Sequence, residues 1–590
     1  MMMMMRGYLS LRRSLLHLEG CRSHLIPRYL HSNVTQRSLV RDNDGNQAPV
    51  SKRSPFFTTP IFYVNAKPHI GHLYSACLAD AAHRWQRILK APDSIFATGT
   101  DEHGLKVQKA ARTAGKEPLT FCNEVSHEFR RLFEMCNIGY TDFIRTTEER
   151  HHTAVHEFWT SLREKGFIYK GEYEGWYSVT DESFLTTSQI QEIDRGDGTT
   201  IKVSLESGNV VEWTSETNYM FRLSAFRDKL LRWLDDNPSA VQPAKFHSIV
   251  RHWLNEGIQD LSVSRQRDRL GWGIPVPDDP SQTIYVWMDA LVNYLTVSGY
   301  PDRTHLWPPT HIVGKDILKF HAIYWPAFLM AADISPPASV ICHSHWTRDS
   351  FKMSKSKGNV IDPFDRAAHF TTDGLRYFLL REGVLHSDGD YSDMKVSALL
   401  NAELADTYGN LLSRVAAPTL NPQQVFPVLD SNLFPSRPGQ STTARTTDED
   451  YLLVESVKRL PDIVGEHYEQ FLFYRGLEEI MTCLRMANAF VQRHEPWNLT
   501  KNPIDRPWLD SIIHVTMETL RVCGILTQPI VPDLTDRLLT KIGVEKMERS
   551  WEQLKCFEAL EGDDREGYGG RGLSGDSSVL FSRLKTESRR

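Results

Sequence analysis

The chain has 590 residues, of which 41% are hydrophobic and 24% charged, the composition of an ordinary soluble protein with several domains. No uninterrupted apolar stretch approaches the roughly 18 residues needed to cross a bilayer, which excludes a protein built on membrane-spanning helices. The formal net charge is −6, so any binding of a nucleic acid requires lysine and arginine to be concentrated on one face.

The first 41 residues differ in composition from the rest of the chain. They contain seven arginines, no lysine and a single acid, Glu19, while Leu11, Leu15 and Leu18 lie on one helical face. This pattern is typical of a mitochondrial transit peptide, whereas a secretory signal needs an apolar core of about seven or more residues. The alternative is a disordered basic tail on a cytosolic enzyme. We expect residues 1–45 to be a transit peptide with its linker, and the protein to act in the mitochondrial matrix.

Two further features of composition follow. The first 41 residues carry +6, seven arginines less one glutamate, so the remaining chain carries −12. The eight cysteines are scattered and form no Cys-x-x-Cys pair. This usage indicates a reducing compartment and mostly buried thiols.

The first predicted strand is the apolar and β-branched run at residues 56–64, and a helical pattern follows it. The turn between them contains His69, Gly71 and His72 in a His-x-Gly-His sequence. A helix N-terminus offers backbone N–H groups and a favourable dipole to an anion. Gly71 would let a nucleotide approach the backbone. One apolar face of the predicted helix is formed by Leu73, Ala76, Cys77, Ala81, Trp85 and Ile88.

Alternating strand and helix patterns continue after this turn and indicate the first half of a doubly wound parallel sheet. Short strands with Gly, Asp and Ser turns then indicate an inserted domain, and long helical patterns dominate the C-terminal part. The expected divisions are 1–45 (transit peptide and linker), 55–165 (first half of the sheet domain), 165–255 (inserted domain), 256–344 (second half), 345–394 (lysine loop and stem-contact region), 395–560 (helical domain) and 561–590 (flexible tail).

A second motif follows the second half of the predicted sheet. It places Lys352 and Lys355 three residues apart among Met353, Ser354 and Ser356, with Lys357-Gly358-Asn359 next. Such a segment can bring positive charge onto a polyphosphate and then withdraw. On its own it could equally be a solvated basic loop.

The two motifs in this order resemble the two signature motifs of the class I aminoacyl-tRNA synthetases. Further segments are similar to the methionyl-tRNA synthetases, in their mitochondrial form, over nearly all of the chain from about Phe56 to about Pro532. The matching segments are 98–104 (TGTDEHG), 285–290 (YVWMDA), 312–316 (IVGKD), 320–321 (FH), 375–382 (LRYFLLRE), 410–414 (NLLSR) and 495–497 (EPW).

The resemblance implies an α/β fold: a doubly wound Rossmann-type parallel sheet with a small inserted domain, followed by an all-α anticodon-binding helix bundle. It also implies a reaction, in which methionine and ATP form methionyl-adenylate and pyrophosphate, and the aminoacyl group then passes to the terminal adenosine of tRNA. The attacking carboxylate is ionised at neutral pH, so the first step needs positioning and charge stabilisation but no general base.

The phosphates would be contacted by His69 and His72, with Lys352 and Lys355 reaching the departing pyrophosphate. The alternative for the histidines is packing, or capping of the helix. ATP, taken as its Mg²⁺ complex, would also be bound by Gly71, Gly314, Asp316, Ser354 and Ser356. Within that set, Gly314 and Asp316 resemble the pair that contacts ribose.

The methionine site would combine a carboxylate with aromatic rings. Asp101 would pair with the substrate ammonium, because a carboxylate in a pocket is costly without a cation. Aromatic rings suit a thioether, since each sulfur–aromatic contact is worth about 0.3–1.5 kcal/mol. Leu291 stands where some relatives have proline. The expected methionine-binding residues are Ile61, Tyr63, Asp101, Trp287, Ala290, Tyr294 and His321; the alternative for each ring is ordinary core packing.

For tRNA, Asn410 and Arg414 lie four residues apart and so share one helical face, and Trp497 offers a stacking surface to an unpaired base. By resemblance they would read the CAU anticodon of methionine tRNA. Arg493 and His494 would add positive charge nearby. The alternative for Trp497 is simple packing.

The chain departs from the family at the zinc knuckle that many methionyl enzymes carry. Ser178 and Asp181 stand where cysteines of the knuckle would be, and serine is a poor zinc ligand. We therefore expect no structural zinc and no other resident metal. The chain also ends soon after the helices, which favours a monomer. Since no apolar stretch is long enough to cross a bilayer, we also expect no association with membranes.

Three rival interpretations remain. A small nucleotidyltransferase would not need the long helical region after the lysine motif, and a branched-chain synthetase would carry a larger editing insertion. An RNA-binding protein without catalysis would not need His69, His72, Lys352, Lys355 and Asp101.

Overall fold

A computed structural model describes residues 54–585, except 92, 179–182, 186, 195–198, 206, 303–305, 354–357, 431–432, 434–444, 558–567 and 576–577. The predicted transit peptide, residues 1–45, lies outside the described residues, as do residues 561–567, 576–577 and 586–590 of the predicted tail.

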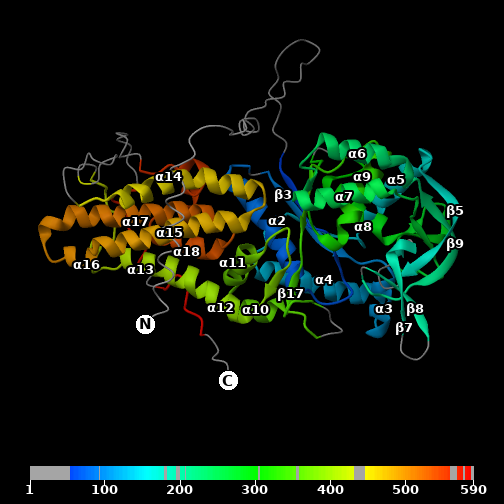
Figure 1. Ribbon diagram of the computed structural model, residues 1–590, viewed down its shortest axis with the longest axis horizontal. Coiled ribbons are helices and arrows are strands. Elements are labelled where there is room, and N and C mark those ends of the chain that lie inside the picture. The colour runs from blue at the N-terminus through cyan, green and yellow to red at the C-terminus, as the bar shows by residue number, and fades with distance from the viewer. Residues whose placement is uncertain are drawn as a thin grey trace, which may run out of the picture. The chain divides into compact units, whose positions relative to one another are not determined.

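A seven-stranded parallel sheet forms the centre of the N-terminal half (Figure 1). The strand order is β10-β16-β15-β1-β3-β2, and β4 pairs with β3 as well. Every described strand pair of this sheet is parallel, as the sequence predicts for a doubly wound fold. The strands are β1 (Phe56–Thr58), β2 (Phe62–Tyr63), β3 (Ile95–Asp101), β4 (Asp142–Arg145), β10 (Val241–Gln242), β15 (Thr310–Gly314) and β16 (Ser339–His343).

Helices cover both faces of this sheet. Successive strand residues point to opposite sides, so neighbouring residues pack into different buried clusters. Ile312 of β15 and Ile341 of β16 belong to one buried cluster, while their neighbours Val313 and Val340 belong to another. The first cluster contains residues of α2 (Ile70–Ile88) and α4 (Pro118–Met135). The second contains residues of α5 (Glu149–Glu164), α7 (Ala244–Glu256), α8 (Val286–Ser298) and α9 (Trp325–Ala331).

Antiparallel strands form a second structure between the two halves of the sheet. In its four-stranded sheet the order is β11-β9-β5-β6, and β5 and β9 pair along most of their length. A two-stranded hairpin, β7 with β8, and a three-stranded sheet, β12-β14-β13, complete it. These strands are β5 (Ile168–Ser178), β6 (Ser183–Leu185), β7 (Ile190–Asp194), β8 (Thr200–Ser204), β9 (Glu212–Phe221), β11 (Leu261–Ser262), β12 (Ser264–Gln266), β13 (Pro275–Val276) and β14 (Asp279–Ile284).

The chain crosses between these sheets at residues that composition does not reveal. β10 lies within the expected inserted range 165–255 yet pairs with β16 of the central sheet. β11 lies beyond residue 255 yet pairs with β9 of the antiparallel sheet. Both strands have two residues, too few to leave an alternating pattern in the sequence.

A small three-stranded sheet carries the chain into the lysine motif. β17 (Trp346–Arg348) pairs antiparallel with β18 (Phe351–Lys352) and parallel with β19 (Gly389–Tyr391). Asp349 and Ser350, which connect the first two strands, both have positive φ, the conformation of a tight hairpin turn. The side chain of Asp390 accepts a hydrogen bond from the backbone N–H of Ser350 and so supports this turn.

The C-terminal half is a bundle of helices (Figure 1). α14 packs against α15, and α15 packs against α17. The remaining elements of this half are α10 (Pro363–Phe370), α11 (Thr372–Glu382), α12 (Asp393–Leu400), a π-helical turn (Asn401–Gly409), α13 (Asn410–Val415), α14 (Asp448–Glu469), α15 (Phe473–His494), α16 (Pro496–Leu499), α17 (Arg506–Thr527) and α18 (Pro532–Lys541). The described elements before α10 also include α3 (Leu105–Thr113), α6 (Arg227–Asp236), a π-helical turn (Phe320–Tyr324) and 3-10 turns at 187–189, 223–226 and 315–317. Further 3-10 turns lie in the C-terminal half at 503–505, 546–548 and 551–554.

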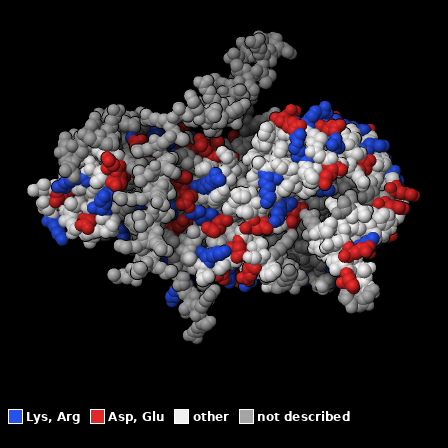
Figure 2. Space-filling view, viewed as in Figure 1, with Lys and Arg blue, Asp and Glu red and all other residues white. Residues whose placement is uncertain are grey.

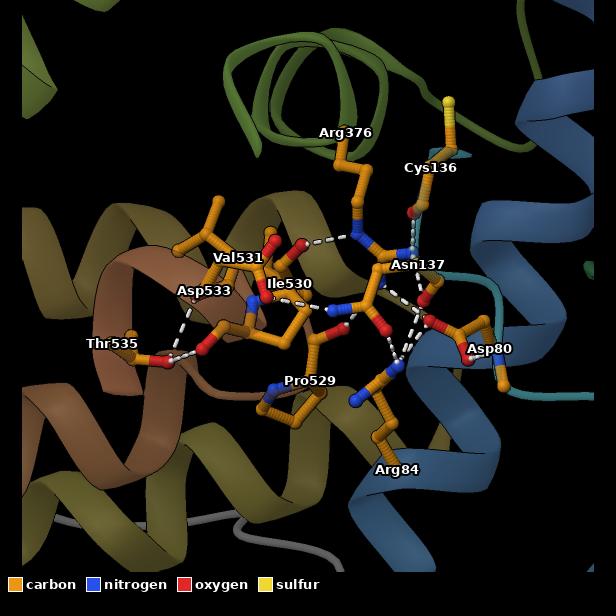
Figure 3. A network of polar contacts seen from close by, with 12 residues as sticks. Asp80, Arg84, Cys136, Asn137, Arg376, Pro529, Ile530, Val531, Asp533 and Thr535 are labelled. Carbon is orange, nitrogen blue, oxygen red and sulfur yellow. Dashed lines mark hydrogen bonds and ion pairs between the residues drawn. The ribbon is translucent and has the colours of Figure 1, made fainter. Parts of the chain in front are cut away.

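A buried arginine joins the bundle to the sheet domain (Figure 3). Arg376 of α11 is fully buried, and its guanidinium donates to the Asp80 carboxylate of α2 at 2.6 Å. Arg84 donates to the same carboxylate at 2.8 Å, and Asp80 keeps its pKa below the ordinary value because the two arginines outweigh burial. The other donations of Arg376 go to the backbone carbonyl oxygens of Cys136, Asn137, Pro529 and Ile530.

Candidate active site

A cavity of about 360 Å³ lies at the carboxyl ends of the parallel strands β2, β3, β15 and β16. This is where an open parallel sheet binds its ligands. Twelve of the residues that the sequence predicts for ATP and methionine line this cavity: Ile61, Tyr63, His69, Gly71, His72, Asp101, Trp287, Ala290, Tyr294, Gly314, Asp316 and His321.

His69 and His72 are held by the first turn of α2. His69 is the N-cap residue, and its Nδ1 accepts the N–H of Gly71 at 3.1 Å. The Nδ1 of His72 accepts the N–H of His69, also at 3.1 Å, so the two side chains form a reciprocal capping box. A nitrogen that accepts carries no proton, so each neutral ring bears its proton on Nε2, as a donor. The capping alternative for His69 is therefore real, but it occupies Nδ1 alone.

Gly71 is required by the position of the His69 ring. A Cβ added at Gly71 would lie 2.9 Å from Cε1 and 3.1 Å from Nδ1 of His69. The two imidazole rings stack with their centroids 3.7 Å apart. A side chain at residue 71 would therefore displace the ring pair, which is a different reason for glycine from the approach of a nucleotide.

Asp101 lies at the end of β3, opposite Tyr63 of β2 in the register, and is 2% exposed. The next residue, Glu102, is fastened by Arg145, whose Nε and second terminal nitrogen donate to the carboxylate at 2.7 and 2.9 Å. Thr147 also donates to Glu102, at 2.7 Å. The backbone that presents Asp101 is therefore firmly held.

Aromatic rings surround the inner part of the cavity. Trp287 stacks on Phe320 with ring centroids 3.5 Å apart, and Tyr63 meets Trp287 edge to face at 6.3 Å. Ala290 and Leu291 follow on the same helix, α8, and also line the cavity. This arrangement forms an apolar, aromatic slot suited to an unbranched thioether.

The polar groups of the slot are neutral. His321 donates through Nδ1 to the carbonyl of Ile317 at 2.9 Å, so its Nε2 accepts the hydroxyl of Tyr294 at 2.7 Å. Burial lowers the pKa of His321 to about 4, which keeps the ring uncharged at neutral pH. The ring of His311 lies near that of Tyr294, with 4.2 Å between the two ring centroids. Burial holds the pKa of His311 well below its ordinary value.

The opposite part of the cavity holds residues that sequence reasoning missed. His343, at the end of β16, lies 2.8 Å from Ser75 of α2, and burial lowers its pKa to about 4. His345 lies 3.3 Å from the carboxylate of Asp316. Histidines directly after a predicted parallel strand were a usable signal for both. The missed lining residues are Pro60, Phe62, Ser75, Ile317, His343, Ser344, His345, Trp346 and Met353, together with Leu291, noted only as a departure from the family.

The lysine motif is described in part. The backbone of Lys352 ends β18, and Met353 lines the cavity, so the chain reaches the site at this point. Ser354, Lys355 and Ser356 lie outside the described residues.

The three predicted anticodon residues lie on the bundle. Asn410 and Arg414 are exposed on α13, and Trp497 on α16 is 40% exposed. Both helices pack against α17. The expectation that Arg493 and His494 offer positive charge is wrong, because both contact the fully buried carboxylate of Asp450.

Charges on the face of the molecule drawn in Figure 2 are mixed rather than separated by sign. The face in Figure 2 shows basic and acidic side chains interspersed over both the bundle and the sheet domain. Among the described residues, no cluster of metal-ligating side chains is present, and no helix is long and apolar enough to cross a membrane. Ser178 ends β5, while Asp181 lies outside the described part of the chain. Seven cysteines are described, and all of them are buried.

Family models and known protein sequences point to the same family. Residues 55–416 match the family model described as tRNA synthetases class I (M), and residues 441–574 match the anticodon binding domain of methionyl tRNA ligase. The chain is 54% identical over 578 residues to the mitochondrial methionine–tRNA ligase of Takifugu rubripes, covering 98% of this chain and 97% of that one. It is 53% identical over 537 residues to that of Homo sapiens, covering 90% of each.

Solved structures agree. Mycobacterium tuberculosis methionyl-tRNA synthetase in complex with methionyl-adenylate superimposes with a TM-score of 0.81 at 36% identity, covering 90% of this chain and all of that one. The free form of that enzyme gives a TM-score of 0.76 at 33% identity, covering 91% and 99%. The chain belongs to the class I tRNA synthetases of the methionyl family.

Proposed function

We propose that this chain is a methionine–tRNA ligase that serves mitochondrial protein synthesis. In the first step a carboxylate oxygen of methionine attacks the α-phosphorus of ATP, the bond to the β-phosphate breaks, and pyrophosphate leaves. In the second step a ribose hydroxyl of the terminal adenosine of methionine tRNA attacks the acyl carbon, and AMP leaves. The observation that carries the proposal is a single cavity that joins a histidine-capped helix N-terminus to a carboxylate and an aromatic slot.

On the phosphate side, His69 and His72 would donate from Nε2 to the triphosphate, beside the N-terminus of α2. Lys352 and Lys355 would follow the departing pyrophosphate, assisted by Ser354 and Ser356. The substrate is ATP with Mg²⁺. Gly314 and Asp316, both in the cavity wall, would hold the ribose.

On the methionine side, Asp101 would bind the ammonium and the slot would take the thioether. The slot residues are Ile61, Tyr63, Trp287, Ala290, Tyr294 and His321. Neutral histidine suits this role, since a charge beside the thioether would favour water. Homocysteine lacks only one methyl group, so its exclusion by shape is limited to about 1–3 kcal/mol.

The tRNA would bind along the helical domain, with Asn410, Arg414 and Trp497 at the CAU anticodon. We further propose a monomer that does not associate with membranes, acts in the mitochondrial matrix and holds no structural zinc. The working division of the chain is 55–165 and 256–344 for the sheet domain, 165–255 for the insertion, 345–394 for the lysine loop, 395–560 for the bundle and 561–590 for the tail.

Amino-acid-dependent exchange between ATP and radioactive pyrophosphate tests the first step without tRNA. We expect exchange with methionine and none with leucine, isoleucine or valine. Charging of methionine tRNA with the CAU anticodon tests the second step. Exchange with none of these amino acids would contradict the proposal.

A further inference from the structure

A buried carboxylate lies directly behind the cavity without lining it. Asp289 belongs to α8, between Trp287 and Ala290, and both of these neighbours line the cavity. The carboxylate is 0% exposed. A buried charge of this kind is strongly unfavourable unless it is paired and hydrogen-bonded.

Two histidines supply that pairing from different elements. His103 contacts one oxygen of Asp289 through Nδ1 at 2.7 Å, and His151 contacts the other through Nε2 at 2.8 Å. Burial alone would raise the pKa of Asp289, but the two histidines outweigh burial and hold the pKa below its ordinary value. An ionised carboxylate only accepts hydrogen bonds, so both histidines are donors.

The two histidines connect Asp289 to different elements of the fold. His103 lies in the loop after β3, two residues beyond Asp101, and is 4% exposed. His151 lies in α5, and its Nδ1 contacts Thr296 of α8, two residues beyond Tyr294, the last residue of that helix to line the cavity. The bond to His103 therefore joins the loop that presents Asp101 to the helix that presents Trp287, whereas the bond to His151 only joins two helices.

Other side chains also hold this loop: the indole N–H of Trp272 donates to the carbonyl of Glu102, and the hydroxyl of Thr146 accepts the N–H of Glu102. Glu102 is held on the side of β4 by Arg145 and Thr147, as described above. His103 supplies the connection on the opposite side, to α8. Loss of that connection would remove the hydrogen bond between the loop that follows Asp101 and the helix that forms the aromatic slot.

We propose that Asp289 and His103 are positioning residues for the substrate amino acid: their hydrogen bond sets Asp101 at the right distance from Trp287 for an α-ammonium and a thioether to be bound together. The inference rests on the proposed function, because it takes Asp101 as the partner of the ammonium. A misplacement of about 1 Å in a preorganised site can cost about 10²-fold.

Two matched variants test it. His103→Leu and His151→Leu each leave Asp289 with a single donor. His151→Leu also removes the contact with Thr296, so it removes at least as much buried polar pairing as His103→Leu. For His103→Leu we expect the KM for methionine in ATP–pyrophosphate exchange to rise between tenfold and a hundredfold, with the KM for ATP unchanged within twofold. The inhibition constant of methioninol, which keeps the ammonium and lacks the carboxylate, should rise with it. For His151→Leu we expect the KM for methionine to stay within threefold.

A second pair keeps the polarity of residue 103 and decides the matter if a leucine variant does not fold. The amide nitrogen of asparagine can occupy the place of Nδ1, while that of glutamine lies nearer the place of Nε2. His103→Asn should therefore keep the KM for methionine within threefold of the unchanged protein, and His103→Gln should raise it at least tenfold.

Equal changes in His103→Leu and His151→Leu, or in His103→Asn and His103→Gln, would overturn the proposal, as would a rise in the KM for ATP equal to that for methionine. Failure of the proposed function is a separate result. It would appear as no methionine-dependent exchange by the unchanged protein, before any variant is compared.

Discussion

Replacing Arg376 by methionine should loosen the attachment of the helical bundle to the sheet domain. The guanidinium makes five donations to groups in three other segments, and it is fully buried (Figure 3). Methionine keeps much of the packing of the aliphatic stem but has no donor. Asp80 would keep Arg84 and the N–H of Gly139, while the carbonyls of Pro529 and Ile530 would lose this partner.

The cost can be estimated from these contacts. The donation to a buried carboxylate is worth about 1.5–3 kcal/mol, and each of the two shorter carbonyl contacts contributes about 1 kcal/mol. The sum, about 4 kcal/mol, lies within the range of about 3–5 kcal/mol for removing one partner of a buried ion pair. At about 1.4 kcal/mol per tenfold change, opening at this junction should become roughly 10³-fold more frequent.

Hydrogen–deuterium exchange of the folded protein measures that opening locally, which avoids treating a chain of several domains as a two-state system. Backbone amides in 529–541 and 136–139 should lose about 10³-fold in protection in Arg376→Met, while those in the centre of β15 should not. Arg459→Met, at an exposed arginine of α14, is the control and should change nothing. A loss of protection below about threefold in Arg376→Met would refute the assigned role of this arginine.

Three other predictions follow from single contacts. Gly71→Ala should lower the rate of ATP–pyrophosphate exchange by about 10²-fold or more, because the added Cβ would collide with the His69 ring. The melting temperature should stay the same or rise, since alanine favours a helix over glycine by about 1 kcal/mol. An unchanged rate of exchange would contradict the capping geometry. Burial raises the pKa of Asp373 from 3.8 to about 6, so the ionised carboxyl destabilises the fold as the pH rises through that interval, and the full cost is present above it. Asp373→Asn should therefore stabilise the contact between α11 and α18 by about 1–3 kcal/mol at pH 7.5 and hardly at pH 4, measured as hydrogen-exchange protection of the amides around Leu534 relative to the unchanged protein at each pH. A gain independent of pH would count against this reasoning. Arg414→Ala should lower kcat/KM for charging methionine tRNA at least tenfold, about 1.4 kcal/mol, with exchange unchanged, and an equal loss in both assays would remove Arg414 from the anticodon site.

Sequence patterns were sufficient to predict the central sheet and the turn that holds the two histidines. The strand at Phe56, the turn with His69 and His72, and the helix after them form a local unit, and local periodicity determines such units. The alternation of strands and helices also indicated the parallel sheet. Once the sheet is known, the rule that ligands bind at the carboxyl ends of strands brings Asp101 and Gly314 to one site.

Contacts between distant segments left no such pattern. Asp289 and His103 lie 186 residues apart, and Arg376 and Asp80 lie 296 apart, so neither pairing has a local signal in a single sequence. Arg493 and His494 show the resulting error. They read as a basic patch beside Trp497, but the buried Asp450, more than 40 residues earlier, takes both of their contacts.

Active-site titration tests the central claim most directly. The protein is mixed with methionine and MgATP without tRNA, and the pyrophosphate released in the first turnover is counted against the number of chains. We predict a burst of about one pyrophosphate per chain with methionine and none with leucine, and retention of methionyl-adenylate by the protein. A burst that is absent with methionine, or equal with leucine, would contradict the assignment of this cavity to methionine activation.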